Sequence, residues 1–185
     1  WRYAGRKAPM DVWRVDVSGE NLAQVTQIDD IGNPFLSYDG KWLYYINGKG
    51  DLFRKPLFGG APEKMGSCGE VDYEGGNGSM PMEGEVFFAE ATLKSEKKGL
   101  IRYDLNTGHS ELIFEDDYFV HTQCEPRKGE SVAIQYRPKN GDARYGIWLL
   151  DQGGGNLRPV KVENPNGHWM WSYDGRLVCN VSSPP

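Results

Sequence analysis

The sequence lacks a hydrophobic run long enough to cross a membrane. Its most apolar stretches, such as residues 42–46 and 147–150, are short, whereas a membrane-spanning helix needs roughly 20 apolar residues. It also lacks the apolar stripes of helical repeats, and its 24 glycines interrupt the chain too often for a coiled coil or a helical bundle. We therefore expect a turn-rich, all-β protein with no membrane-spanning segment.

Cysteine is scarce. The chain has three cysteines, Cys68, Cys124 and Cys179, and no Cys-x-x-Cys pair, so neither a disulfide framework nor a zinc knuckle is indicated. This pattern favours a cytoplasmic protein. A periplasmic or secreted location stays open, because a removed signal peptide leaves no trace in the mature sequence.

Positive charge is neither abundant nor clustered. The formal net charge is −5 at pH 7, with 21 Lys and Arg against 26 Asp and Glu. Because a nucleic acid would find no broad electrostatic footprint on such a protein, we expect no nucleic-acid partner. A small anionic ligand stays open, since a few basic residues in a pocket can outweigh the screened field of distant charges.

Four turns ending in glycine recur about every 45 residues along the chain. They read Ser-Tyr-Asp-Gly at 37–40, Pro-Met-Glu-Gly at 81–84, Pro-Arg-Lys-Gly at 126–129 and Ser-Tyr-Asp-Gly at 172–175. Each turn is followed by a run rich in β-branched and aromatic residues. Such a repeat, with about four short strands in each unit, is typical of the blades of a β-propeller.

We therefore predict a single all-β domain, a β-propeller of four-stranded antiparallel blades with about four blade equivalents. The predicted blades are partial at 1–28 and 168–182 and full at 33–66, 77–115 and 120–163. The ragged ends favour a fragment of a larger ring, of seven blades, over closure as a ring of four. An open propeller edge invites pairing with another chain, so we expect some self-association.

Counting back from each turn glycine gives one register that is polar in all repeats. Asn33, Asn77, His121 and His168 occupy it, at the entry to the innermost strand and near the axis, where propellers commonly hold ligands. Apolar side chains would serve better if the position only packed between blades. We interpret the four residues either as parts of a shared ligand site or as caps of turns.

Three further residues lie close to the two axial histidines in sequence. Gln123, two residues after His121, is expected on the same side of its strand and can supply a hydrogen bond or a ligand oxygen. Trp169 and Trp171 flank His168 and are interpreted as core between blades. Asn33, Asn77 and Gln123 are accordingly the candidate substrate-binding residues.

The segment 66–78 is rich in glycine. A phosphate-binding loop would need a buried strand before it, a helix after it and usually a lysine, and the pattern shows none of these. We interpret the segment as a flexible connection between blades.

An ordered series of motifs runs through the second half of the chain. It comprises Gly-Leu-Ile-Arg-Tyr-Asp-Leu-Asn-Thr-Gly at 99–108, Val-His-Thr-Gln-Cys-Glu-Pro at 120–126, Asp-Ala-Arg at 142–144 and Gly-His-Trp-Met-Trp-Ser-Tyr-Asp-Gly at 167–175. This series resembles the middle to late blades of the oligogalacturonate lyases, which are seven-bladed propellers. Residues 1–98 resemble only propeller repeats of the TolB type.

The lyase resemblance implies a function and roles for three residues. It implies cleavage of short galacturonides, which are small acidic sugars, with His121 as the base, His168 as one ligand of a divalent metal such as Mn²⁺, and Arg144 on the sugar carboxylate. In a β-elimination the proton alpha to the carboxylate is removed, so a metal ion or an arginine must stabilise the developing enolate. A neutral imidazole can accept that proton near neutral pH.

The sequence also departs from the pattern of the lyase family. Thr122 follows His121 where the family usually has proline, and Trp-Met-Trp follows His168 where the family has Glu-Phe-Trp. The other metal ligands of the family lie in a later blade, which this chain does not contain.

Two alternative functions follow from these departures. One is a non-catalytic TolB-like propeller that binds a protein or glycan partner. The other is a propeller that gates a peptidase, whose catalytic domain would lie elsewhere because the chain has no Gly-x-Ser-x-Gly motif.

Overall fold

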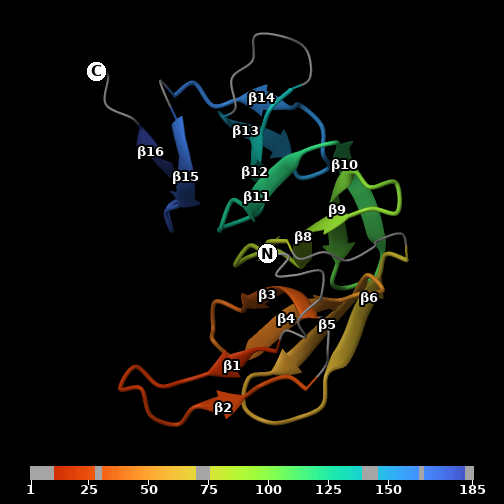
Figure 1. Cartoon of the computed structure of the whole chain (residues 1–185), viewed down its shortest axis with the longest axis vertical. Coiled ribbons are helices and arrows are strands. Elements are labelled where there is room, and N and C mark those ends of the chain that lie inside the picture. The colour runs from red at the N-terminus through yellow and green to blue at the C-terminus, as the bar shows by residue number, and fades with distance from the viewer. Residues whose placement is uncertain (1–10, 28–30, 70–75, 139–145, 163–164, 182–185) are drawn as a thin grey trace, which may run out of the picture.

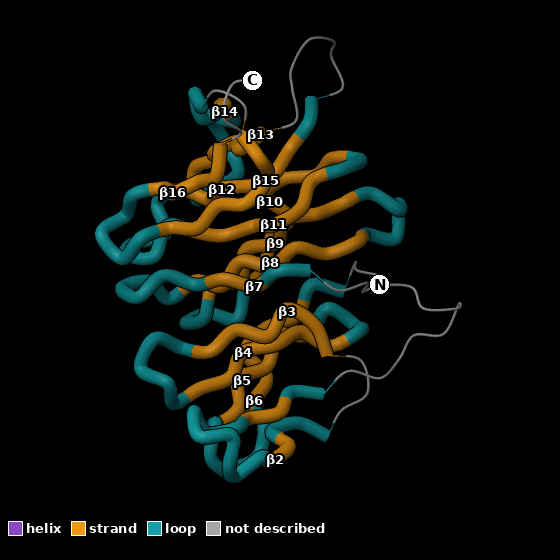
Figure 2. The backbone as a smooth tube through the Cα atoms, turned by 60° about the vertical axis from the view of Figure 1, so that its left-hand side comes forward, coloured by secondary structure: helices purple, strands orange, loops and turns teal. Residues whose placement is uncertain are grey.

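The protein is all-β over the part of the chain that the structure describes. This computed structural model describes residues 11–27, 31–69, 76–138, 146–162 and 165–181, and at 165–168 and 181 it describes the backbone alone. These residues form strands β1 to β16 joined by turns and loops, without a helix among them (Figure 2). The predicted fold class is thereby confirmed. Within the same residues there is accordingly no helix of the length and hydropathy that a membrane span needs.

Three four-stranded antiparallel sheets follow one another along the chain, and each is built in chain order. The first sheet contains β3 (Ile31–Leu36), β4 (Trp42–Asn47), β5 (Asp51–Pro56) and β6 (Glu63–Ser67). The second contains β7 (Gly78–Ser79), β8 (Val86–Thr92), β9 (Lys98–Asp104) and β10 (Ser110–Asp116). The third contains β11 (Phe119–Cys124), β12 (Ser131–Tyr136), β13 (Gly146–Asp151) and β14 (Arg158–Pro159).

A two-stranded sheet stands at each end of this series. β1 (Trp13–Arg14) pairs with β2 (Ala23–Gln24), and β15 (Pro165–Trp171) pairs with β16 (Leu177–Val181). Figure 1 shows the successive sheets arranged as an arc, with β3, β11 and β15 toward its inside and β6 and β14 toward its outside. β7 contacts both β3 and β11, so the innermost strands of the three large sheets meet.

The apolar cores lie between neighbouring sheets. On β8, Phe87 and Ala89 pack against the first sheet, whereas the alternate residues Val86 and Phe88 pack against the third. Successive side chains of a strand point to opposite faces, so a strand that is covered on both sides needs apolar residues at consecutive positions. The continuous apolar run of β8 therefore follows from its place in the middle of the arc.

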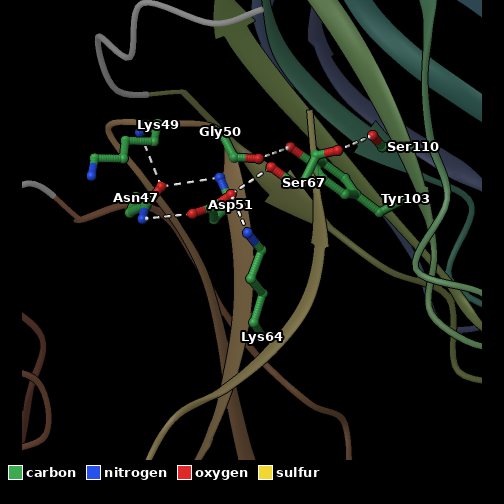
Figure 3. A network of polar contacts seen from close by, with 8 residues as sticks. All are labelled: Asn47, Lys49, Gly50, Asp51, Lys64, Ser67, Tyr103 and Ser110. Atoms are coloured by element: carbon green, nitrogen blue, oxygen red, sulfur yellow. Dashed lines mark hydrogen bonds and ion pairs between the residues drawn. The ribbon is translucent and has the colours of Figure 1, made fainter. Parts of the chain in front are cut away.

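A network of polar contacts joins the first two sheets through β5, β6, β9 and β10 (Figure 3). The Tyr103 hydroxyl donates to the carbonyl oxygen of Gly50 at 3.0 Å, and the Ser110 hydroxyl donates to the carbonyl oxygen of Ser67 at 2.6 Å. The Ser67 hydroxyl in turn donates to the carboxylate of Asp51. The Gly50 carbonyl also accepts from the N–H of Cys68 at 2.9 Å, so the Tyr103 hydroxyl adds a second, cross-sheet bond to the same oxygen.

On the innermost side, the same two sheets approach too closely for side chains. A Cβ atom on Gly78 would lie 2.5 Å from the carbonyl oxygen of Asn33 and 2.6 Å from a ring carbon of Phe87. Within the second sheet, a Cβ atom on Gly76, just before β7, would also collide with the backbone of Glu90 on β8. The prediction of a flexible connection is therefore wrong for Gly76 and Gly78, whose role is to permit close packing.

Replacing Gly78 by alanine should lower the free energy of unfolding by about 1–3 kcal/mol, because the added methyl group overpacks this contact. Gly153 is the matched control, since a Cβ atom there meets nothing within 4 Å. Urea denaturation of the wild type, Gly78→Ala and Gly153→Ala measures both effects. Equal midpoints for the two variants would contradict the close approach.

Candidate functional site

Three of the innermost strands share an irregularity at the register of the predicted site residues. In β3, β11 and β15 the pairing with the next strand shifts at this register. Asn33 and His121 lie in two of these bulges, with φ angles of 52° and 57°. Left-handed backbone at a non-glycine residue is costly, and it tends to occur at functional sites. Strained backbone therefore occurs at two of the residues that the sequence predicts to form a ligand site.

Asn33 is buried, with 1% of its surface exposed. Its Nδ2 donates to the carbonyl oxygen of Glu90 at 2.9 Å, and its Oδ1 accepts from the N–H of Gly76 at 3.0 Å. Asn33 thus ties the first sheet to the second where the innermost strands meet. A substrate contact for this residue stays a prediction.

A pocket of about 340 Å³ lies along the innermost strands, at the small end of the ~300–1,000 Å³ range of ligand pockets. The predicted site residues Asn77 and Gln123 both line it. The lining draws on β3, β7, β11, β15 and the turns that follow them, and comprises Phe35, Tyr38, Asn77, Gly78, Ser79, Thr122, Gln123, Cys124, Pro126, Trp171 and Tyr173.

The aromatic part of the pocket comes from the first and last sheets. Tyr38 and Tyr173 belong to the two Ser-Tyr-Asp-Gly turns and are 52% and 78% exposed. The indole Nε1 of Trp171 donates to the carbonyl oxygen of Gln123 at 3.1 Å, which fixes this ring against β11. Phe35 packs edge-on against Tyr38, with ring centroids 5.9 Å apart. None of the described lining residues carries a charge.

Sequence reasoning misses Tyr38 and Tyr173, because an Asp-Gly turn is unspecific by itself. The available signal is that the turns at 37–40 and 172–175 are identical, whereas the corresponding positions of the other two turns carry Met82 and Arg127. Only the curvature of the arc shows that the two tyrosines share a pocket.

The two tryptophans that flank His168 differ in their surroundings. Trp169 is buried against the third sheet, as predicted for a core residue. Trp171 packs against the same apolar cluster but also lines the pocket. The prediction that Trp171 is a core residue therefore holds for its packing, and the structure adds that the same ring lines the pocket.

His121 is exposed on β11, directly before the pocket residues Thr122 and Gln123. The bulge interrupts the two-residue alternation of the strand, so Thr122 and Gln123 both line the pocket, whereas His121 is not among its described lining residues. Arg144 lies outside the described residues. His168 lies in β15, where only the backbone is described.

A manganese site does not emerge from the described part of the chain. Within it, no three or more His, Cys, Asp or Glu side chains gather in a way that could hold a metal ion. A catalytic metal ion usually has three protein ligands, so the described residues do not by themselves fit the group that the lyase resemblance implies.

Two buried titratable groups adjoin the pocket. Burial raises the pKa of Cys124 to about 12, so its thiol stays protonated and is not a nucleophile. Burial also raises the pKa of Glu90, which is 4% exposed, against the opposing effects of Lys98 and of hydrogen bonds from Thr122 and Asn77. A buried acid with a shifted pKa beside a pocket often marks a functional site.

No protein-family model and no curated protein matches this chain. Solved structures do. An oligogalacturonate lyase in complex with manganese has a TM-score of 0.72 and 20% identity, covering 94% of this chain and 53% of that one. An oligogalacturonate lyase from Vibrio parahaemolyticus has a TM-score of 0.69 and 17% identity, covering 91% of this chain and 52% of that one.

TolB from Acinetobacter baumannii is similar to a comparable degree, with a TM-score of 0.69 and 18% identity over 94% of this chain and 44% of that one. The fold is a partial β-propeller of the kind found in these proteins. The chain spans about half the length of the structures it matches. At these identities the likeness concerns the fold, and it leaves the choice between a lyase and a binding propeller to the site itself.

Replacing Glu90 by glutamine should stabilise the protein increasingly as pH rises from about 4.5, the ordinary pKa of a glutamate, toward 7. Because the pKa is raised in the folded state, the contribution of Glu90 to stability is full below that ordinary value and is lost as the buried carboxyl ionises. Urea denaturation across this pH range measures the gain over the wild type. Glu130→Gln is the exposed control, and a gain for Glu90→Gln that does not grow with pH would refute the assignment.

Proposed function

We propose that the pocket along the innermost strands binds a short saccharide. The observation that carries this proposal is the composition of its lining, in which aromatic rings stand beside amide and hydroxyl groups. A sugar ring has apolar C–H faces and a rim of hydroxyl groups. Aromatic side chains pack against such faces, while a few placed polar groups fix the orientation of the ligand.

The polar residues of the pocket suit hydroxyl groups. Asn77 and Gln123 each offer amide donors and an acceptor, and Ser79 and Thr122 carry hydroxyls. The buried Ser79 hydroxyl is engaged with Cys124, whose N–H donates to it at 3.0 Å, so Asn77 and Gln123 are the residues left to contact the hydroxyls of a ligand. The likeness to oligogalacturonate lyases supports a saccharide over other small polar ligands.

Isothermal titration with galactobiose and with digalacturonate tests this function. Tyr38→Ala and Tyr173→Ala should each weaken binding of the preferred disaccharide by roughly threefold to tenfold, because each removes an aromatic contact of about 0.5–1.5 kcal/mol. Tyr118→Ala, which removes a tyrosine that is 50% exposed and is not one of the described lining residues, should leave binding unchanged.

Failure of both disaccharides to bind the wild type would refute the saccharide proposal. Capture of a protein partner that the Tyr38→Ala variant no longer binds would instead support the TolB-like alternative, in which the same face of the propeller contacts a polypeptide.

A second candidate is an oligogalacturonate lyase with His121 as its base. The observation in its favour is the left-handed bulge of β11 that places His121 next to the pocket residues Thr122 and Gln123. The likeness to two lyase structures supports it as well. In this reaction His121 takes the proton alpha to the uronate carboxylate, the electron pair forms the double bond, the C–O bond at the beta carbon breaks, and the leaving sugar oxygen takes up a proton from water. Arg144 would pair with the carboxylate, and His168 would bind a divalent metal such as Mn²⁺.

The lyase candidate predicts that digalacturonate and Mn²⁺ give an absorbing unsaturated product, and that His121→Ala abolishes it while leaving digalacturonate binding within about threefold. The expected loss of rate is on the order of 10²–10⁴, the usual contribution of a general base. His109→Ala, at an exposed turn, is the control. Binding of digalacturonate without any product would support the saccharide-binding function and count against catalysis by this chain.

A further inference from the structure

One residue breaks the apolar pattern of the buried strand β8. Val86 and Phe88 face the third sheet and belong to its core, and the next residue on that face by alternation is Glu90. Glu90 is 4% exposed, and Thr122, with which it forms a hydrogen bond, is fully buried. Placing a carboxylate where packing alone would favour leucine or valine is costly, unless the charge meets donors.

Two of the three donors that Glu90 meets belong to Thr122, in the bulge that also contains His121, and the third is the N–H of Asn77. The Thr122 hydroxyl donates to Oε2 of Glu90 at 3.4 Å, and the carboxylate also interacts with the backbone N–H groups of Thr122 and Asn77. His121 and Thr122 lie together opposite the single residue Ile134 of β12. The extra residue of such a bulge has no partner in the ladder, so its buried N–H needs another acceptor.

The first sheet meets the same need differently. In β3 the corresponding bulge contains Asn33 and Pro34, between the paired residues Gly32 and Phe35. Pro34 stands where Thr122 stands in β11, and proline has no N–H to satisfy. A residue other than proline at this point of β11 brings an N–H group, and the carboxylate of Glu90 interacts with it.

We propose that Glu90 is a positioning residue, whose carboxylate holds the Thr122 peptide and thereby fixes the bulge that sets the pocket residues Thr122 and Gln123 and presents His121. The effect on ligand binding rests on the proposed saccharide-binding function of the pocket. The contact between Glu90 and Thr122 does not depend on any ligand. The main chain of Glu90 supports the same arrangement, since its N–H donates to Asn77 at 3.1 Å and its carbonyl accepts from Asn33 at 2.9 Å.

The equivalent position of the third sheet carries a polar residue as well. Gln135 on β12 is 4% exposed and follows the apolar residues Val132, Ala133 and Ile134, just as Glu90 follows the apolar run of β8. In the first sheet the same position is Ile46, which is buried in the core. A polar side chain thus occurs at this position in the two sheets that precede an axial histidine, and an apolar one in the sheet that precedes Asn77.

The test replaces the acceptor while keeping its volume. Glu90→Met removes the acceptor oxygens, whereas Glu90→Gln keeps one and removes the charge. Glu90→Met should speed amide hydrogen exchange at Thr122 by about tenfold or more, because a hydrogen bond to a charged group is lost, and should weaken disaccharide binding at the pocket by at least fivefold. Glu90→Gln should keep both close to wild type.

A second arm uses compensation. The Thr122→Pro substitution removes the Thr122 N–H and hydroxyl, so in this background Glu90→Met should no longer weaken binding. The double variant should also be more stable to urea than Thr122→Pro alone, because in the single variant the Glu90 carboxylate stays buried without the two Thr122 donors. Tyr103→Phe is the control, because it removes a buried hydrogen bond between the first two sheets that lies outside the pocket. It should lower the urea midpoint without changing Thr122 exchange or binding.

The outcomes separate the two proposals. Normal Thr122 exchange in Glu90→Met, or the same effect of Glu90→Met in both backgrounds, would overturn the positioning role. If wild-type protein binds neither disaccharide, the saccharide function fails. The exchange rates and the urea cycle then still decide whether Glu90 holds the bulge.

Discussion

The close approach of the innermost strands is the constraint on which the rest of the structure depends. Sheets that fan out from a common axis are crowded at their inner edges, and here the crowding leaves no room for a side chain at Gly78, which lies against Asn33 of the first sheet. Backbone meets backbone at this point, so some polar groups form hydrogen bonds across the contact between the two sheets. Asn33 does this through its amide, which reaches both the Gly76 N–H and the Glu90 carbonyl.

The same crowding explains why polar residues gather at one register. A bulged, left-handed residue changes the direction of its strand, and the inner strands β3 and β11 each have one. Asn33 and His121 both have this conformation, and the groups around them are buried amides, a hydroxyl and a carboxylate. The chemistry that can act on a ligand is therefore built on the groups that hold the sheets together.

The pocket combines two sources of side chains. The second and third four-stranded sheets supply the polar residues, from strands that the hydrogen bonds of Asn33 and Glu90 hold together. The turns that follow β3 and β15 supply aromatic rings. Tyr38 and Tyr173 are largely exposed, so they can adjust to a ligand, while Asn77 and Gln123 belong to the fixed part. Rigid polar groups give orientation, and exposed rings give contact area at modest entropic cost.

The sequence by itself determined the all-β class and the repeat, because strand alternation and glycine turns are local signals with a fixed period. It also indicated the register of Asn33, Asn77 and His121, and placed Asn77 and Gln123 among the candidates that the pocket contains. It did not indicate that Asn33 is buried, that Gly76 and Gly78 pack tightly, or that Glu90 lies against Thr122. Tertiary structure alone decided these points, since each depends on how closely neighbouring strands or neighbouring sheets pack, and no local sequence pattern encodes that distance.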